Sequence, residues 1–434
     1  MRRVTRTSKI IVGGFLVRAF LGQALFWISY LHLPIASSLQ LGDGFWFFAA
    51  DGPEYLALAQ AAAEQGFSGI LSLGARVPSH FFLQLLAILI IAFGGVASLA
   101  ILINCAAYAL TCAVLVRMRQ NDAQTDLLLA AITFSPAAML FSLQLLKDTL
   151  YCFLIVLMIA IFRRWQELWR RGSAPGPLLA CAAAMLAVVY ALAGIRWYFP
   201  AIVWGSSAIF FLLVSCTARR RGWALAAGAV LFVLLAQAVR FGGLEMPRQI
   251  ARILDPVTAF RSEPAAVTRL VEKARRGFDK TPGGTTIAPG PSVASTPIPQ
   301  TIADRMITGF SAMFLPRFLA QSLGLIRVGG GRGFWLFAEV DTIVFDLLLL
   351  YVVVHCMRAL RDGSARATPL FVLLILVFAI TAGLMIYTIT NFGTLFRLRL
   401  ILYAVAVVTP VTLRKREREE NATSAGERYE GEDV

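Results

Sequence analysis

Four short stretches beside long apolar segments carry charged residues that could bind a substrate or react with it. They contain Asp51, Glu54 and Tyr55; the pair Lys147 and Asp148; Arg196; and the pair Arg397 and Arg399. Charged groups are unfavourable at membrane depth, and proteins tend to retain them there for binding or catalysis. These residues are therefore the candidates for a functional site.

Asp51 is the candidate general base, because a positioned carboxylate can accept a proton from an acceptor hydroxyl or amide. Glu54 follows at i+3 and could share its helical face, and Asp43 precedes both in the same segment. Pro53 is typical of a first helical turn, so these carboxylates could instead cap a surface helix. Tyr55 fits an interfacial anchor as well as a ligand. The pattern leaves these alternatives open.

Arg397 and Arg399 are the candidates for binding a phosphate, because a planar guanidinium matches phosphate oxygens bidentately. Arg196 is the second choice. Lys147 could bind phosphate as a point charge, and Asp148 could orient it or a second substrate. Simpler roles are an interfacial ion pair between Lys147 and Asp148, and arginines that reach lipid headgroups.

The elements that must position these residues are hydrophobic helices. The chain has 434 residues, of which 58% are hydrophobic and 15% charged. This composition predicts an all-α polytopic membrane protein. The net charge of +15 comes from Lys and Arg in short runs between apolar segments. Such runs set membrane orientation and disfavour nucleic-acid binding. The scattered His and Cys residues predict no metal site or other certain cofactor, although a divalent metal stays possible.

Basic runs also predict the orientation of the helices. The run at residues 79–93 is short for a crossing, at about 15 residues, so we interpret it as a shallow or re-entrant helix. Every basic run between spans then falls in the cytoplasm, with both termini, and the four candidate stretches face outward. About ten spans are expected, at residues 10–30, 96–116, 125–143, 149–162, 177–195, 199–216, 223–239, 334–356, 369–387 and 400–413.

The chain is expected to divide into four parts. Residues 1–240 form a transmembrane module whose first outer loop is 31–95, and residues 241–333 form a large outer loop that is partly helical. Within it, residues 281–299 are rich in Pro, Gly, Ser and Thr and are expected to be flexible. Residues 334–413 are the C-terminal transmembrane helices, and residues 414–434 form a cytoplasmic tail.

The order of these features resembles the GT-C class of integral-membrane glycosyltransferases. After the first span, residues 51–59 read Asp-x-x-x-Tyr and lead into an Ala-rich helix, and residues 78–94 form a Pro-led segment ending in Gly. Ser135-Pro136 and the Lys147-Asp148 turn resemble the second acidic loop of the class. Asn391-x-Gly-Thr-x-x-Arg-x-Arg is similar to a pattern in bacterial members of the mannosyl and arabinosyl type. The resemblance covers the layout of about the first 220 residues and the last span.

This resemblance implies a bacterial inner-membrane enzyme that moves a sugar from a polyprenyl-phosphate donor to a periplasmic glycan, lipid or protein. It implies Asp51 as the base and basic residues, among them Lys147, that bind the donor phosphate. The chain departs from the class where many relatives carry adjacent Asp-Glu, because here Gly and Pro separate Asp51 from Glu54. Asp43 or Glu54 could therefore be the base.

Two alternative functions stay open. A polymerase or ligase of lipid-linked saccharides would place its active group in the large outer loop, where Glu245, Arg248 and Arg252 are candidates. A transporter or flippase would need no base. The absence of a visible internal repeat disfavours a transporter built from two similar halves.

Overall fold

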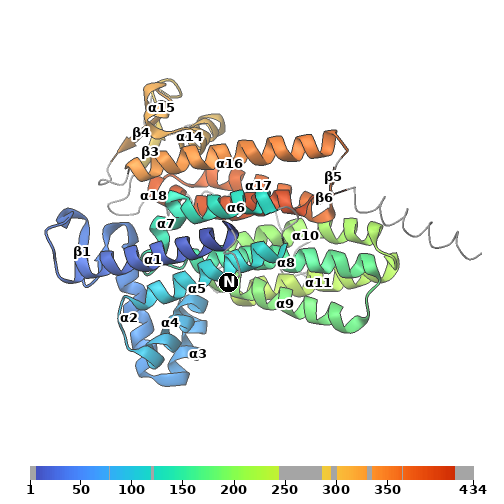
Figure 1. Cartoon of the computed structure of the whole chain (residues 1–434), viewed down its shortest axis with the longest axis horizontal. Coiled ribbons are helices and arrows are strands. Elements are labelled where there is room, and N and C mark those ends of the chain that lie inside the picture. The colour runs from blue at the N-terminus through green and yellow to red at the C-terminus, as the bar shows by residue number, and fades with distance from the viewer. Residues whose placement is uncertain are drawn as a thin grey trace, which may run out of the picture.

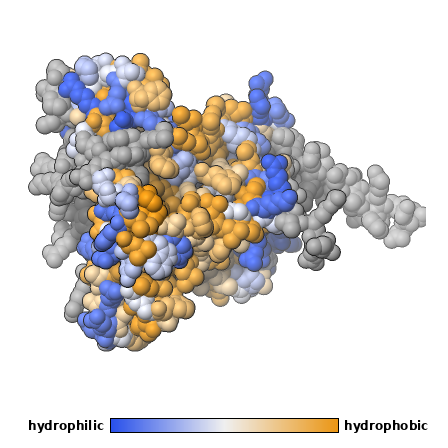
Figure 2. All heavy atoms as spheres, turned by 60° about the vertical axis from the view of Figure 1, so that its left-hand side comes forward, coloured by the Kyte–Doolittle hydropathy of each residue, from blue (hydrophilic) through white to orange (hydrophobic). Residues whose placement is uncertain are grey.

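The computed structural model describes residues 6–77, 79–118, 122–243, 286–294, 301–329, 335–363 and 365–415. Eight helices in these ranges are long and apolar enough to cross a membrane. They are α1 (Arg6–Tyr30), α5 (Leu99–Met118), α9 (Pro175–Ile195), α10 (Tyr198–Thr217), α11 (Arg221–Gly242), α16 (Trp335–Arg361), α17 (Pro369–Thr388) and α18 (Phe392–Val408). Hydrophobic residues cover much of the middle of the molecule, between hydrophilic clusters (Figure 2). The chain is thus a mainly helical, multi-pass membrane protein.

The number of spans depends on two further elements. Helices α6 (Asp122–Phe134) and α7 (Pro136–Ser142) meet at a 53° bend and would make a ninth span if they are counted as one. Helix α8 (Asp148–Arg171) contains the fourth expected span, residues 149–162, but it is not among the eight. Helix α4 (His80–Phe93) has 14 residues. At about 1.5 Å per residue it is shorter than the hydrocarbon core of about 30 Å.

The first loop folds onto the end of α1 as a small cap. Strands β1 (Gln40–Gly42) and β2 (Phe45–Trp46) pair as a hairpin, flanked by short 3-10 turns at Ser37–Leu39 and Phe47–Ala49. The Trp46 indole donates a hydrogen bond to the Leu25 carbonyl at 2.8 Å, and Ser29 Oγ donates to the Phe45 carbonyl at 2.7 Å. These two bonds attach the hairpin to α1, so the chain enters α2 from a fixed position.

Three short helices follow the hairpin and pack on one another. They are α2 (Gly52–Glu64), α3 (Gly66–Arg76) and α4, and they lie together below the left end of α1 in Figure 1. Gly66 has φ +65° between α2 and α3, a conformation that glycine adopts without strain. α2 is therefore held against α4, whose first turn reaches the site described below.

A second cap is built from residues 286–294 and 301–329. Strand β3 (Thr286–Pro289) pairs with β4 (Ile326–Gly329) beside α14 (Ile302–Phe314) and α15 (Arg317–Ser322). These elements lie toward the same end of the molecule as β1, whereas β5 (Ala365–Arg366) and β6 (Arg414–Lys415) lie at the other end (Figure 1). β3 falls within the segment expected to be flexible. There, its backbone pairs with β4 and Ile287 is buried.

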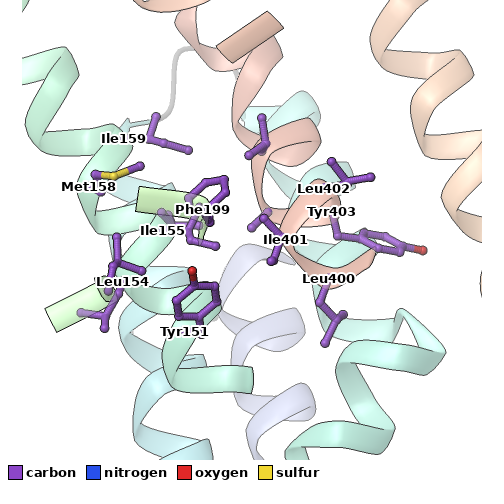
Figure 3. Packing of buried hydrophobic residues seen from close by; sticks show 14 of the residues in the cluster. Tyr151, Leu154, Ile155, Met158, Ile159, Phe199, Leu400, Ile401, Leu402 and Tyr403 are labelled. Atoms are coloured by element: carbon purple, nitrogen blue, oxygen red, sulfur yellow. The ribbon is translucent and has the colours of Figure 1, made fainter. Parts of the chain in front are cut away.

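Helix α18 lies inside the bundle. In its apolar stretch 89% of the residues are buried, against 22% in that of α1. Ile401 of α18 faces Leu154, Ile155 and Met158 of α8, with Phe199 of α10 between them (Figure 3). The arginines of α18 are therefore surrounded by protein, and the prediction that one of them reaches lipid headgroups does not fit this position.

The break between α6 and α7 is stabilised at both of its ends. Pro136 has no N–H and cannot continue α6, but its fixed φ suits the first turn of α7. Arg18, 1% exposed, donates from Nη2 to the Thr133 carbonyl at the end of α6, at 2.9 Å. Asp341 Oδ1 accepts from the Ala137 N–H at the start of α7, at 2.9 Å. A cation at the C-terminus of a helix and an anion at an N-terminus are both favourable.

Asp341 is also the partner of Arg399. Its Oδ2 lies 2.6 Å from Arg399 Nη2, and the two side chains are 0% and 3% exposed. Replacing Asp341 with asparagine leaves the arginine charge buried without a carboxylate. We expect the free energy of unfolding to fall by about 3–5 kcal/mol, measured by thermal or denaturant unfolding in detergent.

The matched control is Asp346→Asn, on the same helix but half-buried and outside the ion pairs found among the described residues. It should change the free energy of unfolding by less than about 1 kcal/mol. Equal losses in the two variants would contradict a specific role for the Asp341–Arg399 pair.

Candidate functional site

Four charged side chains form a continuous row of ion pairs near the start of α8. Arg397 Nη1 lies 2.6 Å from Asp51 Oδ2, and Arg397 Nε lies 2.5 Å from Asp148 Oδ2. On its other side, Asp148 Oδ1 lies 2.6 Å from Arg196 Nη2. Asp148 therefore sits between two guanidinium groups, and each contact is a charge-assisted hydrogen bond.

The exposed fraction of the side chain increases from Asp148 through Arg397 to Asp51. The Asp148 and Arg196 side chains are 1% and 9% exposed, that of Arg397 is 17% exposed, and that of Asp51 is 48% exposed. Asp148 is buried, and each of its carboxylate oxygens pairs with one arginine, so it holds both arginines in place. Asp51 is the carboxylate of this row that an outside molecule can reach.

The positions of these four residues follow from where helices begin. Asp51 immediately precedes α2, and its carbonyl accepts the Tyr55 N–H at 3.1 Å. Asp148 is the first residue of α8, where the helix dipole favours a carboxylate. Arg196 lies in the short connection from α9 to α10, and its carbonyl accepts a hydrogen bond from the Tyr151 hydroxyl at 3.0 Å. Arg397 lies in the second turn of α18.

Lys147 joins the same cluster from the turn before α8. Its Nζ donates a hydrogen bond to Ser79 Oγ and lies 5.3 Å from the centre of the Tyr55 ring. The Tyr55 hydroxyl donates to Asp51 Oδ2 at a long 3.5 Å. Lys147 is thus held between α2 and the start of α4, beside the exposed carboxylate.

Burial and the positive charges of Arg196 and Arg397 together lower the pKa of Lys147 to about 7, although the nearby carboxylates oppose this shift. Burial also raises the pKa of Tyr55 to about 12. Lys147 is therefore close to half protonated at neutral pH, whereas Tyr55 stays a neutral hydroxyl.

The turn that carries Lys147 is fixed from α5. Asn104 Nδ2 donates to the Ser142 carbonyl at 3.0 Å and to the Gln144 carbonyl at 2.7 Å. Asn104 is 1% exposed. It satisfies two carbonyls left open where α7 ends, so the stretch from α7 to α8 cannot shift without breaking buried hydrogen bonds.

One donor of the cluster has no partner. Arg397 Nη2 is buried and makes no hydrogen bond within the described ranges, while Nη1 and Nε are taken by carboxylates. A buried N–H without an acceptor is unfavourable, and an anion that accepted it would relieve that penalty. The cluster can therefore bind an anionic group at Arg397 and Lys147 while Asp51 accepts a proton.

Arg399 lies outside this cluster. Residues two apart on a helix point about 200° away from each other, so Arg397 and Arg399 face different neighbours. Arg399 Nη1 donates to the Met313 carbonyl at 3.1 Å and to Thr342 Oγ1 at 2.9 Å, and its Nη2 pairs with Asp341. These contacts stabilise the packing of α18 against α16 and α14, and we leave Arg399 out of the phosphate site.

Glu54 and Asp43 are also apart from the row. Both are exposed, and neither takes part in an ion pair among the residues that the structure describes. Asp43 occupies the turn of the β1–β2 hairpin with φ +52°. Of the three candidate bases in the first loop, Asp51 is the one that forms an ion pair with Arg397.

Three contributing residues were not predicted. Ser79 carries no signal in the sequence beyond its place at the start of an apolar run, and Tyr151 and Asn104 look like ordinary helix residues. Their hydrogen bonds join segments far apart in the chain, such as Ser79 to Lys147. Arg18 did carry a signal, because an arginine within an apolar span is unusual.

Within the described ranges, no group of three or more His, Cys, Asp and Glu side chains is arranged to hold a metal ion. No protein-family model matches the chain, and no curated protein or solved structure matches it. The resemblance to the GT-C class therefore rests on the residues quoted from the sequence. Glu245, Arg248 and Arg252, the candidates of the alternative reading, lie outside the described residues.

Proposed function

We propose that the chain is a membrane glycosyltransferase that moves a sugar from a polyprenyl-phosphate donor to an acceptor outside the cytoplasm. The observation that carries this proposal is the cluster of Asp51, Lys147, Asp148, Arg196 and Arg397, which come from four separate segments of the chain. A sugar phosphate leaves as an anion, so its transfer needs positive charge at the phosphate and a base at the acceptor. The cluster has both.

In this proposal the side chains have distinct roles. Arg397 Nη2 and Lys147 Nζ bind the donor phosphate, and Asp51 takes the proton of the acceptor as the acceptor atom bonds to the anomeric carbon. The bond from that carbon to the phosphate oxygen breaks, and the phosphate leaves with the electron pair. Asp148 and Arg196 hold Arg397 in place. No nucleotide-binding loop is needed, and the donor and membrane lipids are the expected partners.

The proposal includes an orientation in a bacterial inner membrane of the cell envelope. With ten crossings and α4 shallow, both termini are cytoplasmic and the cluster is periplasmic. Fusions of a topology reporter at Lys147 and at Arg119 check this, since the first should report the periplasm and the second the cytoplasm. The opposite pattern would mean that α4 crosses the membrane.

Lys147 gives the proposed donor site a specific pH dependence. The charged and titratable groups that face it are Asp51, Tyr55, Asp148, Arg196 and Arg397. A phosphodiester keeps a single negative charge near neutral pH, so its affinity should follow protonation of Lys147. With a pKa of about 7, the dissociation constant should rise about tenfold from pH 6 to pH 8.

The control for this prediction is Lys147→Arg, because arginine keeps its charge throughout this range. Its affinity for a polyprenyl phosphodiester, measured by calorimetry in detergent micelles, should stay nearly constant with pH. The same pH dependence in both proteins would show that another group causes it.

The experiment that tests the function uses the full chain in proteoliposomes with a radiolabelled polyprenyl-phosphate sugar. Transfer of label to an added glycan or lipid acceptor supports the proposal. Uptake of a solute without any glycosyl product would favour a transporter or flippase. Polymerisation that survives Asp51→Ala but is abolished by Arg248→Ala would favour a polymerase or ligase.

A further inference from the structure

A large apolar groove lies at the end of the bundle opposite the Asp51 cluster. It is formed by α8, α9 and α11, which run side by side in the lower right of Figure 1, and has a volume of about 540 Å³. The Asp51 cluster lies at the start of α8, and the groove lies around its end. Asp148 and Trp169 lie 21 residues apart on α8, which corresponds to about 32 Å along the helix.

The walls of the groove are aromatic and aliphatic. Three tryptophans, Trp165, Trp169 and Trp223, line it with Leu178 and Leu179. Trp223 and Leu179 are 74% and 70% exposed, so the groove opens onto the outer surface of two helices that are long and apolar enough to cross a membrane. An occupant must therefore present an apolar chain and can enter from the bilayer.

The mouth of the groove is positively charged. Among the described residues that line the groove, Arg220 is the one with a charge, and Arg219 and Arg221 adjoin it in the sequence. The Arg219 side chain lies against Gly172, another lining residue, which follows Arg171. The sequence has no Asp or Glu from residue 168 to residue 244, so no acidic residue of this stretch offsets these arginines.

A second observation points to a bound polar group. Trp169 lines the groove and is only 7% exposed. Its indole Nε1 is buried and has no hydrogen-bond partner among the described residues. A buried indole N–H usually finds an acceptor. The groove thus combines an unpaired donor, a basic mouth and apolar walls.

We propose that this groove binds an anionic phospholipid of the surrounding bilayer, with an acyl chain between α9 and α11 and the headgroup phosphate at Arg220. Arginine pairs well with phosphate, and basic pockets between membrane helices attract anionic headgroups. The tryptophans contact the chain and the glycerol region, where amphipathic aromatic rings are favoured. The groove would thereby fix the relative positions of α8, α9 and α11.

The test uses the tryptophans of the groove as reporters. The purified full chain is placed in phosphatidylcholine vesicles that contain either phosphatidylglycerol or phosphatidylcholine with brominated acyl chains, which quench nearby tryptophans. We expect the brominated anionic lipid to quench at an approximately tenfold lower mole fraction, because a charge-assisted contact to one arginine contributes about 1.4 kcal/mol or more.

Two variants separate charge from shape. Arg220→Gln should remove the preference for the anionic lipid, whereas Arg358→Gln, at the exposed end of α16, should keep it. Ala227→Phe should narrow the groove and reduce quenching by both lipids. Equal quenching by the two lipids in the unmodified chain would overturn the proposal. So would an equal effect of the two arginine variants, or a chain dimer that shields the tryptophans from both lipids.

Discussion

Replacing Asp51 with asparagine is expected to slow sugar transfer by about 100- to 10,000-fold, the usual contribution of a positioned general base. Asparagine has nearly the same size and can still accept the hydrogen bond from Arg397, but it cannot take up the acceptor proton. The dissociation constant for the donor should change little, because the phosphate contacts belong to Arg397 and Lys147. Single-turnover transfer and donor binding, measured separately, check both parts.

Glu54→Gln is the matched control for this prediction. Glu54 lies three residues further along the chain and is exposed, and within the described ranges it makes no ion pair. Its replacement should leave the transfer rate within about twofold of that of the unmodified chain, because Glu54 is exposed and lies outside the ion pairs of the cluster. A large loss in Glu54→Gln with little loss in Asp51→Asn would assign the base to Glu54.

Replacing Arg397 with alanine is expected to affect both stability and donor binding. It removes one of the two cationic partners of Asp148, whose side chain is 1% exposed, and the partner of Asp51. Breaking a buried pair typically lowers the free energy of unfolding by about 3–5 kcal/mol, and the remaining contact with Arg196 puts our expectation at about 3 kcal/mol. Denaturant unfolding in detergent measures this loss.

Arg397→Lys separates the two effects, because lysine keeps the charge but loses the planar, multidentate geometry. It should unfold closer to the unmodified chain, yet bind the polyprenyl phosphodiester about tenfold more weakly, as one charge-assisted contact would be lost. Arg361→Ala, at the exposed end of α16, serves as the control. Unchanged donor affinity in Arg397→Lys would argue against Arg397 as a phosphate ligand.

The sequence predicted much of the cluster because polar residues at the ends of apolar segments stand out. Lys147, Asp148 and Arg196 lie in short connections between helices, and the membrane brings such connections to one of two faces. Arg397 stands out in the sequence because it is an arginine expected on the outer side, against the usual distribution. The structure brings these four residues and Asp51 into one group.

Arg399 shows the limit of this reasoning. The motif around it groups Arg399 with Arg397 as a phosphate ligand, but Asn391 Oδ1 accepts the Thr394 N–H at 3.1 Å, and α18 starts there. The helical phase then turns Arg399 toward Asp341. Because that carboxylate is 58 residues away in the chain, the pair follows from tertiary packing that spacing alone does not reveal.

α18 thereby links the buried scaffold to the proposed site. Arg399 binds Asp341, which holds the start of α7, and Arg397 two residues earlier binds the carboxylates of the cluster. α7 leads into the turn that carries Lys147. The helix break at Pro136, which the sequence marked only by its Ser-Pro pair, is therefore part of what places Lys147 and Asp148 beside Asp51.

The most direct test of the proposed function is a structure of the full chain with a bound polyprenyl phosphate. The proposal predicts the phosphate within hydrogen-bond distance of Arg397 Nη2 and Lys147 Nζ, with the adjacent Asp51 carboxylate free to meet an acceptor. A phosphate bound away from this cluster, for example by the arginines at residues 248 and 252, would contradict it.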